Sequence, residues 1–207
     1  MKISLNNPIN KIQKTEKGYL VNGVKENFLV KKIVICAGKG VEKFSDTKIK
    51  TSYAPIAVVE GLNDDAISFV EECRIAENLE NLKVVVHDVT KLLDFNSEFD
   101  LIYSNLVLQF FDLNQLGAIF DNINKIMQKN SLFLFSTKKP GDKYHNFGTK
   151  INDDTFEYNR IKRYFFDQDS LRTLLEKNFK ILIFDSAQHE NLDKSVSKWW
   201  KILVQKK

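Results

Sequence analysis

The sequence predicts an α/β fold in which a doubly wound, mostly parallel sheet ends in an antiparallel strand and is preceded by an N-terminal β-hairpin. Short apolar runs alternate with segments of helical periodicity, which is typical of a parallel sheet covered by helices. The last two apolar runs lack such a helix between them, so we expect them to pair antiparallel. The 207 residues divide into a hairpin extension, residues 1–30, and one domain, residues 31–207.

The hairpin is predicted over residues 11–30. Two runs of strand-forming residues, Tyr19–Val21 and Phe28–Val30, flank the dipeptide Asn22-Gly23, which adopts positive φ at little cost. We therefore expect the chain to reverse direction there before the main sheet begins.

The first two strands of the main sheet end in residues suited to contacting a ligand. Lys31–Cys36 leads into Gly38 and Gly40, and closely spaced glycines let the backbone turn sharply near a bound molecule, a plain tight turn being the alternative. Ile56–Val59 ends at Glu60, about 20 residues beyond the glycines, where a carboxylate can bind both hydroxyls of a ribose.

The next strand, Lys83–Val86, is followed by Asp88. A carboxylate there can accept a hydrogen bond from an exocyclic amino group such as that of adenine, and an Asp that faces solvent or caps a turn is the alternative. Before this strand, residues 63–75 show a helical period, with Asn63 or Asp64 as N-cap.

The predicted centre of the sheet is Leu101–Tyr103, an apolar run too short for a helix. Ser104 and Asn105 follow it directly, and ligands of open parallel sheets bind just beyond the carboxyl ends of the strands. These two residues therefore mark the expected edge of a binding site.

A helix is predicted over Leu113–Gln128, with a capping box formed by Asp112 and Gln115. Asn130 suits a left-handed exit from this helix. The apolar face is expected to consist of Leu116, Ile119, Phe120, Ile123, Ile126 and Met127.

A further strand, Leu132–Phe135, is again followed by small polar residues, Ser136 and Thr137, and leads into a polar loop over Lys138–Ile151. The loop carries Tyr144, His145 and Asn146, and such a loop above a sheet is a natural lid. We therefore expect it to contribute substrate contacts.

The chain is predicted to end with a helix, Gln168–Lys177, and two strands, Ile181–Phe184 and Trp199–Val204. The polar segment between the strands, Asp185–Lys198, is expected to form a loop. No internal repeat interrupts this order.

Composition and charge narrow the functional classes. The net charge is +4, and lysine pairs are interspersed with acidic residues, which is typical of a solvated surface and does not indicate a nucleic-acid partner. The two cysteines, Cys36 and Cys73, indicate reduced thiols in a cytoplasmic protein. No apolar run approaches the roughly 20 residues that span a membrane, so no membrane contact is expected, and no motif indicates a metal site.

Four stretches in order resemble motifs of class I S-adenosylmethionine-dependent methyltransferases, over about residues 56–207. Residues 60–62 look like the second motif, residues 86–90 like the third and residues 99–111 like the fourth, and residues 199–206 are similar to the last strand of many small members. The resemblance implies a Rossmann-like fold and methyl transfer from S-adenosylmethionine to a small-molecule acceptor. A sulfonium methyl needs little activation, so catalysis would be mostly alignment of the acceptor.

The resemblance also implies roles for single residues. Glu60 would hold the ribose hydroxyls, Asp88 with Val89 would contact the adenine, and Ser104 and Asn105 would lie near the methionine part. The implied cofactor set is Gly38, Gly40, Glu60, Gly61, Asp88, Val89, Ser104 and Asn105. The implied acceptor set is Gln109, Tyr144 and Asn146, with His145 as the candidate general base.

The first motif departs from the family's pattern, which has an acidic residue and three alternating glycines. The aligned positions here are Val34, Cys36, Gly38 and Gly40, so the carboxylate and the first glycine are missing. An alternative function is therefore a catalytically impaired methyltransferase-fold protein that serves as a binding or partner subunit.

Residues 9–60 also resemble part of an FAD-dependent amino-acid oxidoreductase. The hairpin Tyr19–Val30 followed by Lys32–Gly38 looks like the interior strands that lead back toward the flavin in that family. The glycine fingerprint for the flavin pyrophosphate is absent. On this interpretation, the chain joins a flavin-linked oxidoreductase fragment to a methyltransferase core.

Overall fold

The computed structural model describes residues 99–207 throughout and, before them, residues 9–15, 18–23, 27–30, 33–37, 56–58, 75, 83–85 and 89–91. Side chains are described for residues 75, 89–91 and 99–207. Of the helix predicted over residues 63–75, only residue 75 is described, and it is helical.

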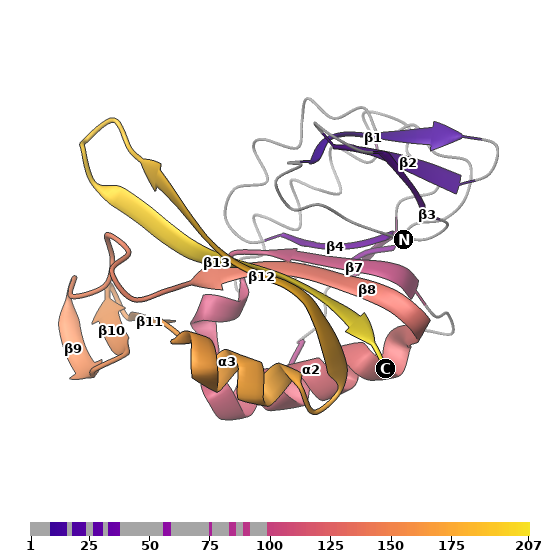
Figure 1. Cartoon of the computed structure of the whole chain (residues 1–207). Coiled ribbons are helices and arrows are strands. Elements are labelled where there is room, and N and C mark those ends of the chain that lie inside the picture. Colours follow the sequence, from indigo (N-terminus) through magenta and orange to yellow (C-terminus); the bar gives the residue numbers. More distant parts are fainter. Residues whose placement is uncertain are drawn as a thin grey trace.

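A seven-stranded sheet forms the centre of the structure, in the order β12-β13-β8-β7-β4-β5-β6 (Figure 1). Neighbouring strands from β6 to β8 are parallel, whereas β13 pairs antiparallel with both β8 and β12. This confirms the predicted parallel sheet with an antiparallel closing strand. The strands are β4 (Ile33–Ala37), β5 (Ile56–Val58), β6 (Lys83–Val85), β7 (Phe99–Asn105), β8 (Met127–Lys138), β12 (Phe179–Glu190) and β13 (Val196–Lys206).

The strand order reverses at β4. The chain runs from β4 outward through β5 to β6, and then returns to the other side of β4 as β7 and β8. At such a reversal a crevice forms beyond the carboxyl ends of the two central strands, because the connections leave them in opposite directions. Those ends are Ala37 of β4 and Asn105 of β7, which are direct partners in the register.

The N-terminal segment forms a second, antiparallel sheet of three strands: β1 (Ile9–Thr15), β2 (Gly18–Gly23) and β3 (Asn27–Val30). The predicted hairpin corresponds to β2 and β3, with Asn22 opposite Asn27. Strand β1 is an addition that the sequence did not indicate. The domain boundary after residue 30 stays a prediction.

Helices α2 (Leu113–Ile126) and α3 (Gln168–Leu175) pack against one face of the main sheet (Figure 1). The predicted capping box starts α2: Asp112 Oδ1 accepts the Gln115 N–H at 2.8 Å, and Gln115 Oε1 accepts the Asp112 N–H at 3.0 Å. Among the described residues, no helix is long and apolar enough to cross a membrane. The buried face of α2 consists of Leu116, Ile119, Phe120, Asn122, Ile123 and Ile126.

Helix α2 ends earlier than predicted. Met127, expected as its last apolar residue, already has an extended backbone and begins β8. Asn130 has a left-handed φ of 65°, but it lies inside β8 and not at the helix exit. The pairing of β8 with β7 is irregular between Met127 and Leu132, and this irregularity accommodates the left-handed residue.

Two segments predicted as loops contain strands. Most of the segment 185–198 belongs to β12 and β13, which continue as a long hairpin beyond the main sheet (Figure 1). The loop predicted over residues 138–151 runs into a three-stranded meander, β9 (Thr149–Asn152), β10 (Thr155–Tyr158) and β11 (Ile161–Tyr164). Both are largely exposed, so their strands lack the apolar alternation by which a half-buried strand is recognised.

Candidate functional site

The carboxyl end of β7 holds Asn105 beside β4. Asn105 belongs to the strand, not to the turn after it, and its Oδ1 accepts the hydroxyl of Ser136 from β8 at 2.5 Å. The next residue, Leu106, has a φ of 53°, and its N–H donates to both the carbonyl and the hydroxyl oxygen of Ser136 at 3.1 Å. The chain therefore turns sharply here, and Ser136 fixes the exposed carboxamide at the edge of the sheet. The sequence placed Asn105 and Ser136 each at the end of a strand, but it did not indicate the hydrogen bond between them.

Ser104 faces the opposite side of the sheet from Asn105. Successive side chains of a strand alternate, so Ser104 shares the helix-covered face with Ile102, a core residue. The Ser104 side chain is 3% exposed, and its Oγ has no hydrogen-bond partner among the described residues. Thr137, on the same face of β8, is fully buried, and its Oγ1 likewise has no partner in the described part of the chain. Buried hydroxyls without a partner are uncommon in native proteins. The sequence indicated Thr137 only as a small polar residue after a strand, not as part of the site.

Gln109 lies just beyond this edge, in the short 3₁₀ helix η2 (Leu108–Phe110). It is 6% exposed, and its Oε1 has no partner in the part of the chain described. Helix η2 is in contact with β11 and β8, so the meander borders the predicted acceptor residue. On β11, burial and then the charge of Asp112 raise the pKa of Tyr164, so this phenol stays protonated at neutral pH.

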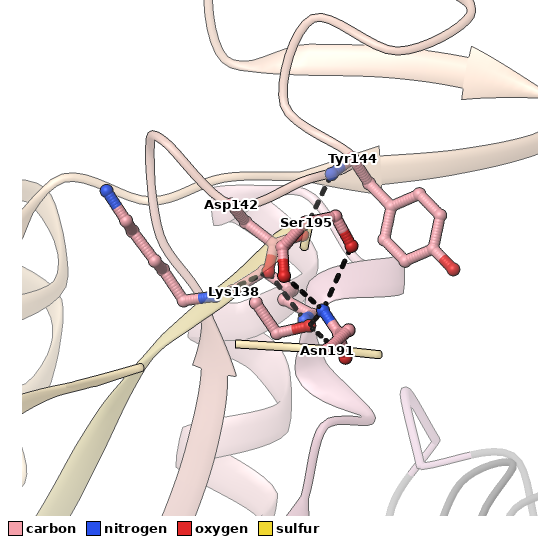
Figure 2. Close-up of polar contacts among 7 residues, drawn as sticks. Lys138, Asp142, Tyr144, Asn191 and Ser195 are labelled. Atoms are coloured by element: carbon pink, nitrogen blue, oxygen red, sulfur yellow. Dashed lines mark hydrogen bonds and ion pairs between the residues drawn. The ribbon is translucent and has the colours of Figure 1, made fainter. Parts of the chain in front are cut away.

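The loop after β8 is fastened by one buried carboxylate, that of Asp142 (Figure 2). Its Oδ2 accepts the Lys138 ammonium and the Lys198 N–H, each at 2.7 Å, and its Oδ1 accepts the Tyr144 N–H at 3.0 Å. Lys138 and Asp142 are both almost inaccessible to solvent. The ion pair therefore ties the loop to the end of β8, and the hydrogen bond from the Lys198 N–H ties it to the start of β13.

Tyr144 is surrounded by cations. The guanidinium carbon of Arg163 lies 4.9 Å from the ring centroid, and the ammonium groups of Lys143 and Lys138 lie 5.2 Å and 6.0 Å from it. Contacts of this kind are attractive because the face of an aromatic ring is negative. The predicted substrate loop thus brings the ring of Tyr144 close to cationic side chains from the loop, from β8 and from β11.

His145 packs against two aromatic rings. Its ring contacts Phe156 and Phe165 edge-on, with centroids 5.1 Å apart in each case. Its Nδ1 lies 3.1 Å from the Nδ2 of Asn146, and its buried Nε2 has no partner among the described residues. Within residues 99–207, no hydrogen bond joins Tyr144, His145 or Asn146 to Ser104, Asn105 or Gln109, so a role for His145 as a base stays a prediction.

Five predicted cofactor residues lie outside the described residues: Gly38, Gly40, Glu60, Gly61 and Asp88. Val89 is described, and its buried side chain belongs to the hydrophobic core; its place in the cofactor site stays a prediction. In the described part of the chain, no group of three or more His, Cys, Asp or Glu side chains is arranged to hold a metal ion.

Comparison with known proteins decides the family. The family model of the tellurite resistance protein TehB matches residues 37–178. The chain belongs to the TehB family. In this TehB-family protein, the match begins at the last residue of β4 and includes every predicted site residue. No curated protein sequence matches the chain.

Solved structures show the fold. A methyltransferase of Methanosarcina mazei that depends on S-adenosylmethionine is 14% identical, with a TM-score of 0.65 over 100% of this chain and 99% of that chain. TehB of Haemophilus influenzae is 18% identical, with a TM-score of 0.58 over 84% of this chain and 57% of its own. The N-methyltransferase NodS of Bradyrhizobium japonicum, in complex with S-adenosyl-L-homocysteine, is 14% identical, with a TM-score of 0.57 over 86% of this chain and 78% of NodS. The fold is that of class I methyltransferases.

These comparisons do not support the resemblance of residues 9–60 to a flavin-linked oxidoreductase. The methyltransferase of Methanosarcina mazei matches the whole chain. In addition, β4, one of the strands on which that resemblance depended, is the central parallel strand of the main sheet, between β5 and β7. The strand is therefore part of the methyltransferase fold.

Proposed function

We propose that this TehB-family protein transfers the methyl group of S-adenosylmethionine to a small-molecule acceptor. The observation that carries the proposal is the reversal of strand order at β4, with Asn105 at the adjoining end of β7, because open α/β sheets bind ligands at such a point. When bound, S-adenosylmethionine supplies an electrophilic methyl group. The chain's own task is then to hold cofactor and acceptor in alignment.

The groups at the end of β7 suit a zwitterionic cofactor. Because Asn105 Oδ1 is occupied by Ser136, the exposed Asn105 amide can donate through its Nδ2 hydrogens to a carboxylate. The hydroxyl of Ser104 is buried on the opposite face of the strand and has no partner among the described residues, so it can donate to, or accept from, a polar group only if that group reaches this face. Neither side chain needs a protonation change to do so.

The rest of the proposed cofactor site follows the family resemblance. Glu60 binds the ribose hydroxyls, and Asp88 with the backbone of Val89 binds the adenine. The glycines Gly38, Gly40 and Gly61 allow the close approach of the backbone.

The acceptor side is proposed to include Gln109 and the loop that carries Tyr144, His145 and Asn146. The buried Oε1 of Gln109 can accept a hydrogen bond from an N–H or O–H group of the methyl acceptor, so an amine or a hydroxyl compound would suit this position. The contact of η2 with β11 supports a role for the meander in covering this side.

Two measurements test the proposed function. Isothermal titration of the purified chain with S-adenosylhomocysteine is expected to release heat at one site. In a panel of small amines, phenols and thiols, at least one compound is expected to make the protein convert S-adenosylmethionine to S-adenosylhomocysteine. A well-folded protein that binds no S-adenosylhomocysteine would overturn the proposal and favour a partner subunit. Binding without turnover of any compound would favour the catalytically impaired alternative.

A further inference from the structure

Asn122 is a polar residue on the buried face of α2. Its neighbours on that face are Ile119, Ile123 and Ile126, and Asn122 itself is only 8% exposed. A buried carboxamide costs free energy unless its hydrogen bonds are made. The position would be occupied at lower cost by an aliphatic side chain, so what Asn122 binds is informative.

The Asn122 side chain binds the segment that follows β6. Its Nδ2 donates to the carbonyl oxygen of Lys91 at 2.8 Å and to that of Thr90 at 3.4 Å. These residues are 31 and 32 positions away in the sequence. One side chain thus fixes two successive carbonyl groups of a turn.

The same segment is fastened a second time, by Val89. Its side chain is buried in the core cluster to which Ile119 and Ile123 also belong. Together, the apolar contact of Val89 and the amide of Asn122 set the position of the backbone from Val89 to Lys91 relative to α2. Sequence reasoning assigned α2 an apolar face and gave Asn122 no role.

We propose that Asn122 is a positioning residue for adenine recognition, which rests on the proposed function because Val89 belongs to the proposed adenine site. Asn122 does not touch the cofactor in this proposal. It holds the carbonyl groups of Thr90 and Lys91, so the Val89 backbone is already in place when adenine arrives. Preorganisation of this kind improves affinity, because the segment is ordered before binding.

The test compares two ligands that differ in the base. Asn122→Leu keeps the size of the side chain and suits the apolar face, and Asn122→Asp keeps the shape and removes the donor. Each variant is titrated with S-adenosylhomocysteine and with S-inosylhomocysteine, which lacks the adenine amino group. Asn178→Ala is the matched control. The Nδ2 of Asn178 donates to Asp121, which lies in α2 beside Asn122 but does not bond to residues 89–91 in the described structure.

We expect the wild type to prefer S-adenosylhomocysteine. The loss of one positioning hydrogen bond is expected to raise the dissociation constant of S-adenosylhomocysteine by about three- to tenfold in both Asn122 variants. The dissociation constant of S-inosylhomocysteine should change less, so the ratio of the two dissociation constants moves toward one. Asn178→Ala should keep the wild-type ratio.

A purely structural role predicts other results. It would lower the melting temperature of Asn122→Leu and weaken the binding of both ligands equally. This result would overturn the inference, and so would an unchanged ratio of the two dissociation constants in both variants. If Asn122→Leu does not fold, Asn122→Asp decides. A wild type that binds both ligands equally would also overturn it, whereas a wild type that binds neither would overturn the proposed function itself.

Hydrogen exchange gives a readout without ligand. Peptides that contain residues 89–91 should exchange faster in the Asn122 variants than in the wild type, while peptides from β12 and β13 should be unchanged. Equal exchange in all proteins at residues 89–91 would show that Asn122 does not order this segment, and would overturn the inference.

Discussion

Gly148→Ala tests how the loop after β8 joins the meander. Gly148 has a φ of +88°, and a Cβ atom added there would lie 2.3 Å from the carbonyl oxygen of Glu157 and 3.0 Å from the Cβ of Tyr158. The first distance is far below van der Waals contact, and the obstacle is backbone. The substitution therefore forces the start of β9 away from β10.

The expected loss has two parts. A left-handed backbone costs an L-residue roughly 1–2 kcal/mol, and relief of an overlap of this kind adds roughly 1–3 kcal/mol. The free energy of unfolding should therefore fall by about 2–5 kcal/mol if the meander unfolds with the rest of the chain. For a domain of this size, that corresponds to a decrease in melting temperature of roughly 4–20 °C.

Two other glycines provide matched controls for calorimetric melting. Gly117→Ala lies inside α2, where the added Cβ would be 3.5 Å from Leu174 Cδ1, and it should raise stability by roughly 0.5–1 kcal/mol. Gly141 has a φ of +81°, but a Cβ added there would meet the flexible side chain of Lys198. Gly141→Ala should therefore lower the free energy of unfolding only by the cost of the left-handed backbone. If Gly148→Ala melts no lower than Gly141→Ala, the assumed contact between β9 and β10 is wrong.

Three further outcomes are expected. Asp142→Ala leaves the buried Lys138 ammonium without its counter-ion and should cost about 3–5 kcal/mol in urea unfolding; an unchanged midpoint would contradict the ion pair's role. The hydroxyl of Ser170, and then its N–H, lower the pKa of Asp167, the N-cap of α3, below the ordinary 3.8, so its contribution to stability is present above about pH 4 and is lost as pH falls through the lowered value. Asp167→Asn should remove that part of the acid dependence of the melting temperature, and a profile parallel to wild type would refute it. Glu60→Ala should weaken binding of S-adenosylhomocysteine by about 1–3 kcal/mol in calorimetric titration, and wild-type affinity would remove Glu60 from the site.

Local signals predicted the elements that are either buried or capped. The capping box of Asp112 and Gln115 was readable because both partners lie within one turn of the helix. The meander and the outer part of the β12–β13 hairpin were not, because their side chains are largely exposed. The prediction that Asn130 ends a helix was wrong for a related reason. Its left-handed φ was expected, but the sequence does not tell whether such a residue ends a helix or interrupts a strand.

The candidate site divides in the same way. Ser104 and Asn105 were indicated because polar residues interrupt an apolar pattern at a strand's end. Ser136 and Thr137 carried the same signal after Leu132–Phe135, but the sequence did not join them to the site. Asn122 carried no signal, because the apolar face of its helix already explained the pattern.

The sequence by itself determined the strands of the main sheet, the helices α2 and α3 that pack against it, where α2 begins, and that small polar residues end the central strand. These depend on hydrophobic periodicity and on hydrogen bonds within a few residues. Only the tertiary structure decided the order of the strands, the bond between Asn105 and Ser136, and the tie from Asn122 to Thr90 and Lys91. The physical reason is that these contacts join residues about thirty positions apart, and only the packing of whole elements brings such residues within reach.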